Sequence, residues 1–165
     1  MGARDRLPGH DVLVRAPVSR DTVTNMTLPP VNYLAVLVSG VVIFMLGGLW
    51  YSPVLFAKPW IALMGRTEEE LKAKAAASSM PVMYLTVFVC GLVTAAVLAV
   101  VIDRFGARSA GAGAVVGALC WLGFAATTSF GTNLFSFESR KLWFINSAYN
   151  LVSFIIAGVI LAIWR

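Results

Sequence analysis

The side chains of this chain best suited to chemistry are aromatic, amide and carboxylate groups beside or within its long apolar stretches. Tyr51 and Trp60 follow the first stretch, Glu138 precedes the last, and Asn146 and Asn150 lie inside the last. Indole N–H, phenol O–H and amide groups form directed hydrogen bonds, and a carboxylate adds a charge. Such a set suits the recognition of a polar ligand, or hydrogen bonding between helices, better than the making and breaking of covalent bonds.

The groups that catalysis requires are missing or scattered. The single histidine, His10, stands in the N-terminal tail, so neither a Ser-His-Asp hydrolase nor a His-containing metal centre has its base or ligands close to the apolar stretches. Cys90 and Cys120 belong to no CxxC pair. No nucleotide-binding glycine motif occurs. We therefore expect no enzyme activity, no cofactor and no metal.

Four apolar stretches must position the polar groups, at about 31–50, 80–102, 109–129 and 142–164. None contains a charged residue or a histidine, and each is long enough, as a helix rising about 30 Å over 20 residues, to cross a bilayer. The chain is 59% hydrophobic and only 13% charged, about half the charged fraction of a soluble domain. The sequence predicts an all-α integral membrane bundle of four transmembrane helices.

Residues 1–25 differ in composition from the rest, with no persistent helical or strand period. We expect a disordered tail, and as an alternative a true start at Met26, so that the domain covers 26–165. Counted from Met26, Lys and Arg are more numerous in the first and third loops, which the positive-inside rule places in the cytoplasm. The net charge of +5 is thus expected to set orientation against the lipid bilayer rather than to bind nucleic acid.

The connecting and packing signals complete the predicted bundle. Two prolines break the helix between 50 and 60, which predicts an interfacial segment, and Thr67 with Glu70 forms a capping-box pattern that begins a short surface helix. Gly113 and Gly117 form a GxxxG helix-packing signal, used either within the monomer or for self-association.

One membrane face is predicted to collect the polar groups, because the end of the first span, the end of the third and the start of the fourth must lie on the same side. The candidate polar face consists of Trp50, Tyr51, Ser52, Lys58, Trp60, Thr127, Thr128, Asn133, Glu138, Lys141, Trp143, Asn146 and Asn150. Asn146, Asn150 and Ser153 also share one face of the last helix. The competing interpretation is purely structural: an aromatic belt at the interface, hydrogen bonds between helices, and Glu138 paired with Arg140 or Lys141.

Two groups of motifs carry a family resemblance. They are Asn32–Val36, Gly47–Pro53 and Lys58–Trp60, and then Phe124–Thr128, Asn133, Phe137-Glu138, Lys141–Trp143, Ile145-Asn146 and Ala148-Tyr149. Over residues 31–165 the chain resembles the small bacterial membrane proteins of domain of unknown function 1761. The resemblance implies a four-helix membrane protein, located in the bacterial cytoplasmic (inner) membrane, and supplies no catalytic residue.

We therefore expect a small multi-pass membrane protein, not an enzyme, that binds a lipid, a small molecule or a partner protein at one face. The alternative is a small oligomeric transporter or channel with a polar path along the fourth helix. A homo-oligomer is also considered, because a four-span monomer has little interior.

Overall fold

The structure, a computed structural model, describes residues 30–164, and the expectations for residues 1–25 lie outside this range. The described chain is helical throughout, with short connections and no strand. Its helices are α2 (Tyr33–Trp50), α3 (Ala57–Leu63), α4 (Glu68–Ala77), α5 (Met80–Arg104), α6 (Ala110–Cys120), the π-helix η1 (Trp121–Ala126), α7 (Thr127–Phe135) and α8 (Arg140–Ile163). The predicted all-α class is confirmed.

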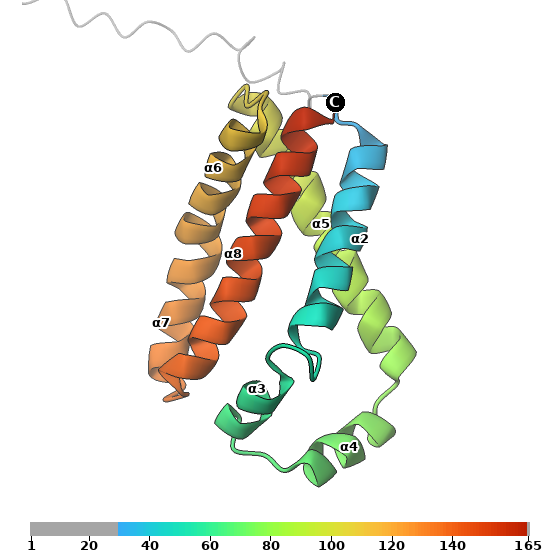
Figure 1. Ribbon diagram of the computed structural model, residues 1–165, viewed down its shortest axis with the longest axis vertical. Helices are drawn as coiled ribbons and strands as arrows, with labels where there is room; N and C mark the ends of the chain where they lie inside the picture. Colours follow the sequence, from blue (N-terminus) through green and yellow to red (C-terminus); the bar gives the residue numbers. More distant parts are fainter. Residues whose placement is uncertain (1–29, 165) are drawn as a thin grey trace, which may run out of the picture.

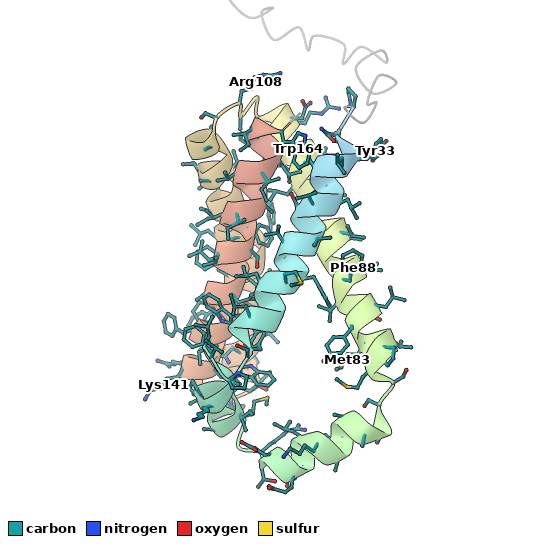
Figure 2. The ribbon with its side chains drawn as sticks, turned by 45° about the vertical axis from the view of Figure 1, so that its right-hand side comes forward. Tyr33, Met83, Phe88, Arg108, Lys141 and Trp164 are labelled. Carbon is teal, nitrogen blue, oxygen red and sulfur yellow. The ribbon has the colours of Figure 1, made fainter. Side chains whose placement is uncertain are left out.

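Four helical segments are long and apolar enough to cross a membrane: α2, α5, the continuous run α6–η1–α7, and α8. They lie side by side, with α8 packed against α2, α5 and α6, while α3 and α4 lie at the end opposite the C-terminus (Figure 1). Tyr33, Arg108 and Trp164 mark one end of the bundle and Lys141 the other (Figure 2). The protein is a membrane protein whose outer apolar side chains face the lipid.

Local signals account for several helix ends. The Asn32 side chain accepts hydrogen bonds from the backbone N–H groups of Leu34 (3.0 Å) and Ala35 (3.1 Å), which caps α2. Thr67 and Glu70 form both bonds of the predicted capping box at the start of α4. These caps accept hydrogen bonds from backbone N–H groups at the start of the helix, which have no carbonyl partner within the helix.

The seam between α6 and α8 is built from glycines. A Cβ added to Gly113 would lie 2.9 Å from the carbonyl carbon of Gly158, and one added to Gly117 would lie 2.8 Å from that of Phe154. Both distances are shorter than ordinary contacts between carbon atoms, which begin near 3.5 Å. The GxxxG pair therefore brings two helix backbones together inside the monomer.

The third span continues to Phe135, six residues beyond the predicted end at residue 129. The polar run Thr127, Thr128 and Ser129 suggested an end, but each hydroxyl donates to a backbone carbonyl one turn earlier, on Gly123, Phe124 and Ala125 respectively. Hydroxyls bonded in this way are acceptable inside a membrane helix. The π-helix η1 precedes them and changes which residues of α7 face α8.

Candidate binding site at one membrane face

The end of α2 is fastened to the first turns of α8 by two aromatic side chains. The indole Nε1 of Trp50 donates to the backbone oxygen of Ile145 at 3.1 Å, and the Tyr51 hydroxyl donates to Oδ1 of Asn146 at 3.0 Å. The helix can end here because the Ser52 hydroxyl donates to the carbonyl of Leu49 at 2.7 Å. The predicted interfacial segment therefore starts as a turn held against α8.

Asn146 is the junction between α2, α3 and α8. Its Oδ1 also accepts a hydrogen bond of 3.1 Å from Nε1 of Trp60 on α3. An indole N–H can only donate, so this bond fixes the amide oxygen toward α3 and leaves the amide nitrogen on the side away from these donors. The rings of Tyr51 and Trp60 lie 5.3 Å apart, centre to centre, which closes this side of the site with aromatic surface.

A third indole anchors the same turn of α8. Nε1 of Trp121, in η1, donates to the backbone oxygen of Ser147 at 3.0 Å. Three consecutive residues of α8, from Ile145 to Ser147, thus each accept an indole N–H from a different element. Because the backbone is held from several sides, the side chains of this turn have defined directions.

Between α7 and α8 lies a hollow of about 360 Å³, which we call the α7–α8 hollow. It is lined by Ser129, Thr132, Asn133, Ser136, Glu138, Trp143, Asn146, Ser147 and Asn150. Trp143 is fixed by donating from Nε1 to the Ser129 hydroxyl at 3.0 Å and by an edge contact with Phe130. Each residue of this lining has a side chain that can form a hydrogen bond.

Two atoms of this lining are buried without a partner. Asn133 is 7% exposed and Ser147 is 4% exposed, and neither Oδ1 of Asn133 nor Oγ of Ser147 has a hydrogen-bond partner among residues 30–164. Most buried polar atoms in proteins do have a partner. Two residues with unpaired polar atoms therefore belong to the lining of one hollow.

A second hollow, of about 520 Å³, adjoins the first; we call it the α3–α8 hollow. It shares Glu138 and Asn146 with the first hollow, and its remaining lining is mixed. Those residues are Trp60, Leu63, Met64, Gly65, Arg66, Leu71, Phe137, Ser139 and Leu142. Both hollows therefore lie at the candidate polar face predicted from the sequence.

The charges at this face are not neutralised by ion pairs. The salt bridge between Glu68 and Lys72 on α4, at 3.9 Å, lies away from this face, and the predicted alternative of Glu138 paired with Arg140 or Lys141 is not found among residues 30–164. Burial, followed by the neighbouring Tyr149, raises the pKa of Tyr51 to about 12. Its hydroxyl therefore remains a hydrogen-bond donor to Asn146 throughout the physiological pH range.

The structure brings together only part of the predicted polar face. Asn133, Glu138, Trp143, Asn146 and Asn150 line the α7–α8 hollow, while Trp50, Tyr51 and Trp60 hold α2 and α3 against α8.

The other predicted residues lie outside the site. Thr127 and Thr128 are exposed and bond their own helix, Ser52 bonds its own turn, and Lys58 and Lys141 are exposed and line neither hollow. They stand at the predicted end of the bundle, but position along a helix does not specify which side of it a residue occupies.

Sequence reasoning also missed four hydroxyl residues of the lining: Ser129, Thr132, Ser136 and Ser147. A usable signal existed for Ser147, because Trp143, Ser147 and Asn150 are spaced i, i+4 and i+7 on one side of a helix. A signal existed for α7 as well, because Ser129, Thr132, Asn133 and Ser136 are spaced i, i+3, i+4 and i+7 along one side of a helix.

A family model described as "Protein of unknown function (DUF1761)" matches residues 34–162. No curated protein and no solved structure matches the chain.

Proposed function

The chain belongs to the DUF1761 family of proteins of unknown function, and we propose that it is a non-enzymatic multi-pass membrane protein that binds a small polar ligand in the α7–α8 hollow. The observation that carries this proposal is the pair of buried, unpaired atoms, Asn133 Oδ1 and Ser147 Oγ, in the lining of that hollow.

The free-energy cost of unpaired polar atoms distinguishes a ligand site from simple helix packing. A buried polar atom without a partner costs about 1–3 kcal/mol, whereas a purely structural polar cluster would bond across the helices. Other donors at this face do so, since Tyr51 and Trp60 both bond Asn146. A hollow of about 360 Å³ also falls within the usual size range of small-molecule sites.

The arrangement favours binding from one face over conduction. The lining of the α7–α8 hollow reaches inward only to Asn150. Further along α8, Phe154 and Gly158 pack their backbones against the glycines of α6. A transporter with a path along α8 would have to separate this seam. We propose the bacterial cytoplasmic membrane as the location, on the resemblance to small bacterial membrane proteins.

Native mass spectrometry of the full chain, released from a mild detergent, tests the proposal. We expect a bound small molecule on the natural protein and its loss in Asn133→Leu, which removes the buried acceptor at similar side-chain volume. Thr94→Val is the matched control, because Thr94 lies on α5 and bonds only its own helix.

Both variants must first give the circular dichroism spectrum and gel-filtration volume of the natural protein. A natural protein that carries no ligand would refute the proposal. A ligand retained equally by Asn133→Leu would also refute it, because binding would then lie elsewhere.

A further inference from the structure

We infer that the ligand of the α7–α8 hollow carries a protonated primary amine, an inference that rests on the proposed function. The first reason is charge. Among the nine residues that line this hollow, Glu138 is the only one with an ionisable side chain. The cationic Arg140 and Lys141 are exposed outside the lining, and Arg66 lines the adjoining α3–α8 hollow instead. An anionic ligand would therefore face a carboxylate and no lining cation.

The second reason is the number and kind of unsatisfied groups. A primary ammonium has three N–H donors and no acceptor. Three residues of the lining could each accept one of these N–H groups: Glu138, whose carboxylate has no ion pair, and Asn133 and Ser147, whose buried Oδ1 and Oγ atoms have no partner. One acceptor from each residue would match the three donors, and the bond to the carboxylate is charge-assisted.

The third reason is an aromatic side chain in the lining, which favours a cationic ligand. The indole of Trp143 lines the hollow and is held in place by Ser129 and Phe130. An aromatic face attracts a nearby cation, most strongly when the face belongs to tryptophan. Asn146 adds a different requirement, because its amide nitrogen lies on the side away from Tyr51 and Trp60 and can donate to an oxygen of the ligand. An amine beside a hydroxyl or ether oxygen fits this combination.

Ethanolamine and choline form the decisive pair of probes. Each carries one positive charge and one hydroxyl, but choline replaces the three ammonium N–H groups with methyl groups. The full chain in a maltoside detergent is titrated with the chloride of each, and tryptophan fluorescence gives the dissociation constant. We expect ethanolamine to bind at least about tenfold more tightly than choline, the ratio expected for the loss of charge-assisted hydrogen bonds.

Glu138→Gln tests the carboxylate with little change of shape. We expect it to weaken ethanolamine binding about tenfold or more. Glu69→Gln is the matched control, because it removes the same charge from an exposed position on α4 that forms neither the ion pair nor the capping box of that helix. It should bind ethanolamine as the natural protein does.

Equal binding of ethanolamine and choline, or an unchanged affinity in Glu138→Gln, would overturn the inference. If a ligand co-purifies and is lost in Asn133→Leu but ethanolamine does not bind, the amine is wrong while the binding function stands. The mass of the co-purified ligand distinguishes the two sources of an amine, since a free amine and an aminophospholipid headgroup would both support the inference at very different masses.

Discussion

Gly117→Ala introduces one methyl group where α6 and α8 touch. The added Cβ would lie 2.8 Å from the carbonyl carbon of Phe154, so the helices must move apart by roughly 1 Å to restore ordinary contact. The obstructing atoms belong to a helix backbone and cannot rotate away. Overpacking of this kind costs about 1–3 kcal/mol, and alanine regains up to about 1 kcal/mol of helix propensity. With the full helix gain the net loss is about 0–2 kcal/mol, and relative to a glycine-to-alanine change without overpacking the loss is about 1–3 kcal/mol.

The assay is unfolding by sodium dodecyl sulfate in mixed micelles, followed by circular dichroism. Gly111→Ala is the control, because Gly111 lies on the same helix with nothing within 4 Å of an added Cβ. The control should be as stable as the natural protein or slightly more stable. If Gly117→Ala unfolds at the same detergent fraction as Gly111→Ala, the seam is not under this constraint. If the loss depends on protein concentration, the glycines serve self-association instead.

Two further predictions concern the aromatic fastening of the site. Asn146→Leu removes the acceptor of the hydrogen bonds from Tyr51 and Trp60, so α3 should detach from α8. Amide hydrogen exchange of residues 57–63 should then become faster. Asn150→Leu is the control, because it leaves both bonds intact and should not change the exchange rate. Since burial raises the pKa of Tyr51 from 10.0 to about 12, its hydroxyl stabilises the fold fully below pH 10 and progressively less as pH rises to about 12. In Tyr51→Phe the tyrosinate absorbance should lack its highest-pH step, and a titration identical to that of the natural protein would contradict the assignment.

The class and topology of this protein follow from its sequence because lipid imposes strict rules. A stretch of about 20 residues without charge must form a helix that satisfies its own backbone. Successive spans must alternate in direction, and this alternation places Tyr51, Glu138 and Asn146 at one face. The capping box at Thr67 is equally local, since both of its bonds join residues three positions apart.

The side of a helix on which each residue lies is harder to predict from the sequence. Thr127 and Asn133 were both assigned to the polar face, yet Thr127 is exposed and bonds its own helix while Asn133 is buried beside α8. Both residues lie on α7, and six positions of regular helix turn the chain by about 240°, so the two side chains point to different sides of α7. The burial of Ser147 likewise depends on how closely α7 approaches α8, a property of packing and not of pattern.

Hydrogen bonding separates the polar residues that serve the fold from those that define the site. The hydroxyls of Thr86, Thr94 and Thr127 donate to carbonyls of their own helices, as side chains near lipid must. Ser147 occupies the same kind of helical position, yet its hydroxyl has no partner and lines a hollow.

The lack of a partner is not sufficient by itself, because the buried hydroxyl of Ser39 also lacks one and lines neither hollow. Among residues 30–164, Asn133 and Ser147 are the residues that have an unpaired buried atom and also line one of these two hollows. Three indole hydrogen bonds also hold this turn of α8 in place. Because α8 is held by three indoles, turning the helix would not give Ser147 a partner on another element, and the proposed ligand would supply one.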